Sequence, residues 1–180
     1  MTASLYGAGA EYALHSLLVL AASDVPLSVA DLAAYQHLPE RFLAKVFSRL
    51  KRAGLVSGIE GIAGGFVLAR PAERIRVLDV LDAVDPGRRV FACAEVRRGY
   101  AVFDGTPPEW ATHGPCRIHH FMSEAEAALR TFLATKTVAD LGDELADKAP
   151  ASFATESEAW FGERRAGRSA RGARPPAPQD

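Results

Sequence analysis

Apolar residues recur at helical spacing near the start of the chain, over about residues 9–22. The apolar positions follow the i, i+3, i+4, i+7 order of a single stripe: Leu14, Leu17, Leu18 and Ala21. The run is too short to span a bilayer, and His15 interrupts it. We therefore expect a buried helix here rather than a membrane segment.

Two further helices are predicted before residue 54. The segment LSVADLAAYQ opens with Ser28 as an N-cap and carries Asp31 three residues later, which is the spacing of a capping box. The segment PERFLAKVFSRLKRAG begins with Pro39, which suits a first helical turn, and ends at Gly54, a natural C-terminal stop. Three short helices thus open the chain.

The third of these helices separates apolar and basic side chains onto two faces. The apolar face holds Phe42, Leu43, Val46, Phe47 and Leu50. The opposite face holds Arg41, Lys45, Arg49 and Arg52, within about 80° of arc. Most basic stripes are ordinary solvated surfaces, so the stripe alone does not predict a nucleic-acid interface.

The next segment changes that interpretation. LVSGI and GFVLA flank EGIAG and read as a β-hairpin, and the segment VLDVLDAVDPG then reads as a short helix. Two helices, a basic helix and a hairpin follow one another in the order of a winged helix-turn-helix, in which the basic helix enters the major groove. We expect such a DNA-binding domain over residues 1–85. The residues expected to read or hold DNA are Ser28, Arg41, Lys45, Arg49 and Arg52.

The second half of the chain has a different organisation. Residues 86–116 are rich in Gly and Pro and are expected to form a long sensor loop. A long helix begins at Arg117 and carries an apolar seam that suits packing against a twin in a dimer. Thr137 and Asp140 form a capping box for a terminal short helix within residues 117–149, and residues 150–180 are expected to be a disordered basic tail. The predicted fold class is mainly α with a small β-hairpin wing: a winged helix-turn-helix plus a long C-terminal dimerisation helix.

Composition narrows the class of protein only modestly. The formal net charge is −1, yet residues 39–54 carry five basic side chains against one acid. The two cysteines do not make a disulfide framework. The first forty residues contain no Lys or Arg, so a signal peptide is not expected. These features favour a soluble cytoplasmic protein with no membrane partner, in which cysteines are reduced, catalytic or metal-bound.

These segments together resemble the Rrf-type family of bacterial winged-helix regulators. The matching stretches are YALHSLLVLA, RFLAKVFSRLKRAGLV, GGFVLARP, LDVLDAVD and TVADL, in family order over about residues 5–145. The resemblance implies a homodimeric transcriptional regulator that binds palindromic operator DNA, as a repressor and not as an enzyme. The wing departs from the family pattern, because Glu60 stands where the family often has an arginine. An acid is costly beside phosphates, so the third helix is expected to read most of the DNA.

Many members of this family hold an iron–sulfur cluster through three cysteines in the loop before the long helix. Cys93 and Cys116 stand where the first and last of these cysteines lie, whereas the middle one is absent. Glu11 matches a carboxylate that family clusters recruit from the partner subunit, and His15 lies on the same helix face, four residues on. We therefore expect Glu11, His15, Cys93 and Cys116 to hold a [2Fe–2S] cluster that senses redox state or nitric oxide, with His119 as a substitute for His15.

Other interpretations stay open at this stage. Each candidate ligand also has an ordinary structural role available: His15 as a core histidine, or Cys93 as a small buried hydrophobe. A regulator without a cluster would sense through a cysteine thiol or a partner protein. A small metalloenzyme would use His113, Cys116, His119 and His120, but their spacing matches no established hydrolase signature.

Overall fold

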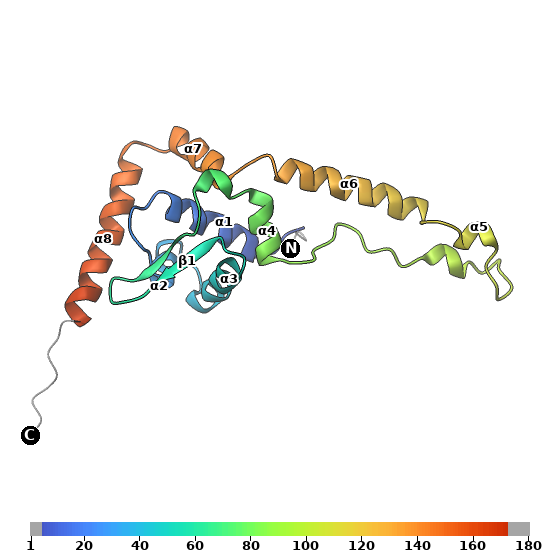
Figure 1. Cartoon of the computed structure of the whole chain (residues 1–180), viewed down its shortest axis with the longest axis horizontal. Helices are drawn as coiled ribbons and strands as arrows, with labels where there is room; N and C mark the ends of the chain where they lie inside the picture. Colours follow the sequence, from blue (N-terminus) through green and yellow to red (C-terminus); the bar gives the residue numbers. More distant parts are fainter. Residues whose placement is uncertain (1–4, 173–180) are drawn as a thin grey trace, which may run out of the picture.

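The computed structural model describes residues 5–172, except for the side chains of residues 171 and 172. Figure 1 shows a helical body from which one long arm extends. We use "arm" for residues 85–133 and "body" for the other described residues. This division separates the elements that share a core from those that do not.

The first half of the body has the predicted element order. Its elements are α1 (Ala8–Ala21), α2 (Val29–Tyr35), α3 (Glu40–Arg52), β1 (Val56–Ile59), β2 (Gly65–Leu68), the 3₁₀ helix η1 (Ala72–Arg74) and α4 (Val77–Val84). The two strands form an antiparallel hairpin. The predicted class, mainly helical with a small wing, is therefore confirmed, as is the succession of helices before the hairpin.

The core of the body forms around the apolar face of α3. Leu43, Phe47 and Leu50 are fully buried, together with Leu17 of α1 and Leu32 of α2. Burial of each such side chain contributes about 1.5–3 kcal/mol, so this face anchors the three helices to one another. Phe42 is an exception to the predicted face.

Two details of the predicted apolar faces need correction. Phe42 is 42% exposed, although its ring packs edge-on against Tyr12 of α1 with the ring centroids 5.6 Å apart. Of the predicted stripe on α1, Leu17 is buried, Leu14 and Leu18 are half-buried and Ala21 is exposed; the other buried positions are Gly9, Ala10, Ala13, Ser16 and Leu20. The reason is that α1 packs against α3, α4 and α7, so small residues line its tightest contacts.

The hairpin is hydrogen-bonded to the segment that precedes α2. Phe66 of β2 exchanges two backbone hydrogen bonds with Leu27, at N···O distances of 2.8 and 3.1 Å. At Gly65 an added Cβ would lie 2.5 Å from the backbone of Leu27, so only glycine permits this approach. The wing is thereby held at a fixed position beside the helix-turn-helix.

The described part of the tail that was predicted to be disordered forms a helix. Thr137 caps α7 (Val138–Lys148) through the predicted capping box with Asp140, and then α8 (Ser152–Gly172) follows. Trp160 and Phe161 of α8 pack against Tyr35 of α2, and Phe161 is only 8% exposed. The prediction from composition overlooked these aromatic residues because arginine, glycine and alanine outnumber them in this segment. The last residues of the predicted tail, 173–180, lie outside the described residues.

The arm consists of a connecting segment that runs out from the body and a long helix that returns. Figure 1 shows the two lying alongside each other, with the 3₁₀ helix η2 (Val96–Gly99) and α5 (Glu109–Thr112) near the outer end. The returning helix is α6 (Arg117–Leu133), and none of its residues is buried. Arg130 links α6 to the body by donating two hydrogen bonds, of 2.8 and 2.7 Å, to the carboxylate of Asp82 on α4.

Within residues 5–172, no helix combines the length and the apolar character that crossing a membrane requires.

Candidate DNA interface and sensor site

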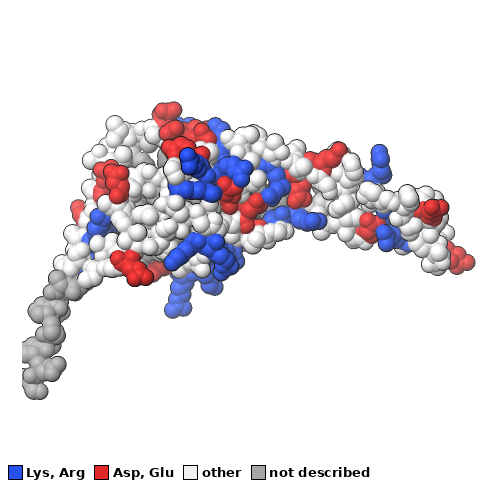
Figure 2. Space-filling view, viewed as in Figure 1, with Lys and Arg blue, Asp and Glu red and all other residues white. Residues whose placement is uncertain are grey.

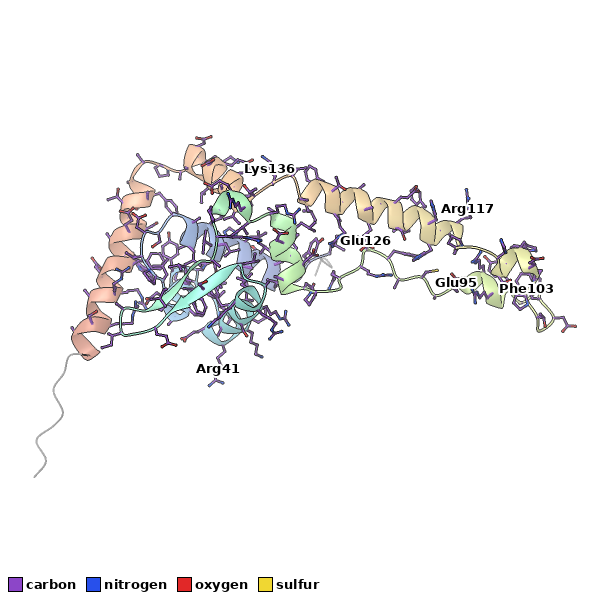
Figure 3. The ribbon with its side chains drawn as sticks, viewed as in Figure 1. Arg41, Glu95, Phe103, Arg117, Glu126 and Lys136 are labelled. Atoms are coloured by element: carbon purple, nitrogen blue, oxygen red, sulfur yellow. The ribbon has the colours of Figure 1, made fainter. Side chains whose placement is uncertain are left out.

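The exposed face of α3 carries the basic residues singled out in the sequence. Arg41, Lys45, Arg49 and Arg52 are all exposed, and Arg41 projects away from the body in Figure 3. Figure 2 shows Lys and Arg side chains gathered over α3 on the lower face of the molecule. This face therefore presents positive charge at the position where a helix-turn-helix places its recognition helix.

Two of the predicted DNA-binding residues also hold the fold together. The Arg49 guanidinium donates a hydrogen bond to the carbonyl oxygen of Val84, at the C-terminal end of α4. Ser28 caps α2: its hydroxyl accepts a hydrogen bond from the Asp31 backbone N–H at 3.1 Å and donates one to the Asp31 carboxylate at 2.7 Å. Asp31 therefore does not complete a capping box in the usual way, because its carboxylate bonds to the Ser28 hydroxyl.

The two cysteines come together on the arm, although 22 residues separate them in the chain. Both are free and partly buried. Cys116 is the N-cap residue of α6, and Cys93 lies in the outgoing segment, where its sulfur is 3.9 Å from the Glu95 carboxylate and close enough to the Cys116 thiol to help lower the pKa of that thiol. Two soft sulfur donors thus share one location at the start of the long helix.

The start of α6 stabilises a thiolate at Cys116. The backbone N–H groups of His119 and Ile118, and to a smaller extent the Arg97 charge and the Cys93 thiol, lower the pKa of the Cys116 thiol, against a partial opposing effect of burial. A thiolate is the form of cysteine that binds metals and attacks electrophiles. The position of Cys116 at the start of α6 therefore favours its thiolate form.

A charged pair that the sequence did not single out supports this location. The Arg97 guanidinium donates hydrogen bonds to the Glu95 carboxylate at 3.1 Å and to the carbonyl oxygen of Gly114. The hydrogen bond from Arg97 is the main cause that lowers the pKa of the Glu95 carboxyl. Glu95 adopts a left-handed backbone conformation, with φ of 51°, and its N–H donates to the Cys93 sulfur at 3.4 Å. Arg97 thus connects the segment of Cys93 to the residues just before Cys116.

His119 lies one turn into α6, near the cysteines. Its Nδ1 atom is buried and has no hydrogen-bond partner among the described residues. The ring lies 6.5 Å from that of Phe91, between ring centroids. The ring therefore offers a nitrogen donor, although the described residues do not group it with the two cysteines closely enough to hold a metal ion.

Glu11 and His15 occupy a different region of the same chain. Both are exposed on α1 in the body, whereas Cys93 and Cys116 lie out on the arm. They line an open groove of about 570 Å³ that Leu14, Val77 and Leu81 also line. His15 is therefore not a core histidine. Over residues 5–172, no three His, Cys, Asp or Glu side chains are grouped closely enough to hold a metal ion, so one chain does not assemble the four predicted ligands.

The two remaining histidines of the hypothetical enzyme site do not join the cysteines. His113 is exposed in the loop after α5. His120 is exposed and its Nδ1 lies 3.4 Å from the Glu124 carboxylate, one turn along α6. These positions give no support to a catalytic metal site.

Large apolar side chains stay exposed along the returning helix. Ile118, Phe121 and Phe132 of α6 are each about two-thirds exposed, at 65%, 67% and 68%. They belong to the seam for which the sequence predicted a twin helix. An apolar row of this kind is typical of a helix that packs on a second chain.

Known proteins match this chain over most of the elements described so far. A model of the Rrf2 family, described as iron-dependent transcriptional regulators, matches residues 6–144. The transcriptional regulator IscR of Xenorhabdus nematophila is 40% identical over 84 residues, which make up 46% of this chain and 51% of that protein. The chain thus spans about half the length of that curated relative.

Two solved structures share the fold. IscR of T. potens superposes with a TM-score of 0.59 at 22% sequence identity, covering 83% of this chain and 93% of that one. CymR, the global cysteine regulator of B. subtilis, gives a TM-score of 0.59 at 22% identity, covering 80% of this chain and 98% of that one. Both likenesses concern the winged-helix fold with its long helix. The family match ends at residue 144, before α8 begins.

Proposed function

Because this chain belongs to the Rrf2 family of DNA-binding transcriptional regulators, we propose that it works as a homodimeric repressor whose DNA affinity depends on a [2Fe–2S] cluster. Members of this family regulate transcription and are not enzymes. The observation that supports the proposal is the proximity of Cys93 and Cys116 at the N-terminus of α6, where His119, with a buried ring nitrogen that has no hydrogen-bond partner among the described residues, follows one turn later.

In the proposed DNA complex, α3 lies in the major groove with its exposed basic face toward the bases. Arg41 and Lys45, early on that face, contact base edges and phosphates, and Arg52 contacts the backbone. Arg49 has a structural role, because one of its nitrogens donates a hydrogen bond to the Val84 carbonyl oxygen. It also remains exposed and can contact the DNA backbone. Ser28 reaches the backbone at the start of α2, where the first helix of the motif crosses it.

Dimer formation is proposed to cover the exposed seam of α6. Pairing two α6 helices would remove Ile118, Phe121 and Phe132 from water. It would also set the distance between the two α3 helices, and with it the spacing of the operator half-sites that the dimer accepts. A second chain is required for another reason, because Glu11 and His15 lie apart from the cysteines of their own chain.

The proposed ligands are Cys93 and Cys116 from one subunit, with His119 or His15, and Glu11 of the partner subunit. A bound [2Fe–2S] cluster supplies a one-electron redox centre that also reacts with nitric oxide. The protein contributes a stabilised thiolate at Cys116 and a ring nitrogen at His119. Because its ligands would come from the arm of one chain and the body of another, the occupied site favours one dimer geometry over others.

The deciding experiment is anaerobic purification followed by a visible absorption spectrum and assays of iron and sulfide. Charge-transfer bands with about two irons and two sulfides per subunit are expected for a [2Fe–2S] protein. Cys116→Ser should lose iron, and so should one of His15→Gln and His119→Gln, which identifies the histidine ligand. The matched control His120→Gln should keep iron, because His120 pairs with Glu124 instead. A protein that stays colourless after one reconstitution, yet binds duplex DNA, would rule out the cluster.

The alternative is a regulator that senses through its thiols, and the proximity of Cys93 and Cys116 favours it as well. A peroxide would oxidise the Cys116 thiolate to a sulfenic acid and release water, after which the Cys93 thiol would displace a second water to form a disulfide. Glu11→Gln separates the two proposals. In a thiol-based regulator this substitution should leave the response to oxidant unchanged, whereas in the cluster-based regulator it removes a ligand of the cluster.

A further inference from the structure

The last helix of the described chain is fixed to the helix-turn-helix by a buried charged contact. Asp31 of α2 is only 4% exposed, and two arginines of α8 reach it. The Arg164 Nε donates to one carboxylate oxygen at 2.9 Å, and Arg168 donates to the other. A buried carboxylate needs such partners, so Asp31 selects a defined position for α8.

Aromatic packing fixes the same contact along its length. Tyr35 of α2 lies 5.2 Å from Trp160 and 4.8 Å from Phe161, between ring centroids. The Tyr35 hydroxyl forms a hydrogen bond of 2.7 Å with the Ser157 hydroxyl. The Arg164 guanidinium also stacks over the Trp160 ring, 4.8 Å from its centroid. These contacts make α8 an integral part of the body rather than an appended tail.

The charge of α8 exceeds what the contact with Asp31 requires. One carboxylate meets two arginines. Arg165 adds a third positive charge and Glu163 one further negative charge, and the described residues offer no ion pair for Arg165. Arg164 and Arg168 keep 43% and 25% of their side-chain surface exposed. Each has N–H groups beyond the one that Asp31 accepts, because a guanidinium carries five. The C-terminal half of α8 is therefore a partly open source of positive charge.

The placement of that charge matters as much as its amount. In a helix-turn-helix the first helix, here α2, crosses the DNA backbone while the second enters the groove. In Figure 1, α8 descends from α7 until its last turn is level with α3, on the side of the body toward which Arg41 projects in Figure 3. An arginine-rich helix packed on α2 and pointing to this side is suited to a phosphate backbone.

We propose that α8 is a second DNA-contacting element, which holds arginines against the phosphate backbone flanking the operator half-site. This inference rests on the proposed DNA-binding function and extends the bound surface beyond α3 and the start of α2. It also assigns a role to residues that follow the family match, which ends at residue 144. The contact carries no base information, so α8 raises affinity evenly across sequences.

The test measures the salt dependence of binding to a duplex that the full-length protein selects from a random DNA library. The variant is Arg164→Gln with Arg165→Gln, which leaves Arg168 on Asp31 and so preserves the docking of α8. The control is Arg74→Gln with Lys148→Gln, which removes two exposed charges from η1 and α7, at the end of the body opposite α3.

Each phosphate contact contributes about 0.9 to the slope of log K against log salt. The α8 variant should therefore show a slope shallower by about 1 to 2 and weaker binding at low salt. The control should match the original chain in slope, affinity and melting temperature. Because the α8 variant removes one of the two arginines on Asp31, its melting temperature is measured beside its binding. If the double variant melts earlier, Arg165→Gln alone is tested, since it leaves Asp31 with both partners.

Three results separate the possibilities. An unchanged slope and affinity in the α8 variants overturns the inference and leaves α8 with a structural role only. A control whose slope of log K against log salt is reduced as much as that of the α8 variant also overturns it, because the weaker salt dependence would then come from the overall charge. If the original chain selects no duplex, the proposed DNA-binding function fails, and that outcome is distinct from the other two.

Discussion

The body and the arm contain similar apolar side chains, but only the body buries a large core of them within one chain. In the body, Phe47 is 1% exposed and contacts residues of several elements, among them Phe66 of the wing, 4.9 Å away between ring centroids. In the arm, Phe121 and Phe132 of α6 are more than 65% exposed. The body is thus complete as a single chain, whereas the arm is a surface that a second chain would complete. The stability of the fold therefore depends on the body and self-association on the arm, so substitutions can change one without the other.

The largest expected effect comes from the body core. Phe47→Ala should lower the free energy of unfolding by about 3–5 kcal/mol, because it leaves a cavity in a fully packed site. Urea denaturation followed by circular dichroism measures this change. Phe47→Leu is the matched control and should cost less than about 1.5 kcal/mol. Equal losses for the two variants would contradict the view that cavity formation governs this site.

The second effect tests whether the arm needs another chain. Phe121→Asp should weaken self-association by at least about 2 kcal/mol, because a charge cannot be buried in an apolar seam without a partner. Sedimentation equilibrium measures the dissociation constant. Ser123→Asp places the same charge on the opposite face of α6 and should leave association unchanged. A Phe121→Asp protein that stays as associated as its parent would place the interface elsewhere.

The third effect belongs to the exposed face of α3, which is also part of the body. Arg41→Ala should weaken specific DNA binding by about 1–3 kcal/mol if the guanidinium reads a guanine, with no loss of thermal stability. Arg74→Ala on η1 removes the same charge from another surface and should bind normally. Fluorescence anisotropy with a selected duplex compares them. Unchanged affinity in the Arg41 variant would remove this residue from the interface.

The smallest expected effect is a shift in the pH at which the Cys116 thiol of the arm becomes reactive. Because backbone N–H groups at the start of α6 lower the pKa of Cys116, its thiolate persists to lower pH than that of an ordinary cysteine. The rate of alkylation by iodoacetamide, followed by mass spectrometry in the metal-free protein, should therefore reach half its maximum at lower pH than in the urea-unfolded chain. Arg97→Gln should return this midpoint part of the way. Identical midpoints in the folded and unfolded proteins would show that α6 does not stabilise the thiolate.

Sequence patterns predicted the body well because its elements carry local signals. The amphipathic α3, the caps at Ser28 and Thr137 and the hairpin turn each depend on a few neighbouring residues. α8 was missed because its composition resembles that of a disordered segment. The spacing of Ser157, Trp160, Phe161, Arg164 and Arg168 places all five on one helix face, and this signal could have revealed it.

The candidate sensor site could be predicted only in part. Family position indicated Cys93 and Cys116, but their proximity depends on how the outgoing segment folds back along α6, for which no local pattern exists. Glu95 and Arg97 were not predicted, since a short-range ion pair in a loop has no characteristic spacing. Whether His15 or His119 completes the ligand set depends on a second chain, and a single sequence does not encode how two chains meet.

The contact between Arg130 and Asp82 gives the arm a mechanical property. This pair, about half exposed on both sides, is the only ion pair among the described residues that joins α6 to the body. Mobile ions weaken exposed pairs of this kind, so the contact between the arm and the body should loosen as ionic strength rises, while Leu133 at the end of α6 stays packed against the body. In a dimer built on α6, the spread between the two α3 helices would then vary with the salt content of the medium. Ionic strength would thus adjust how well the regulator spans its two half-sites.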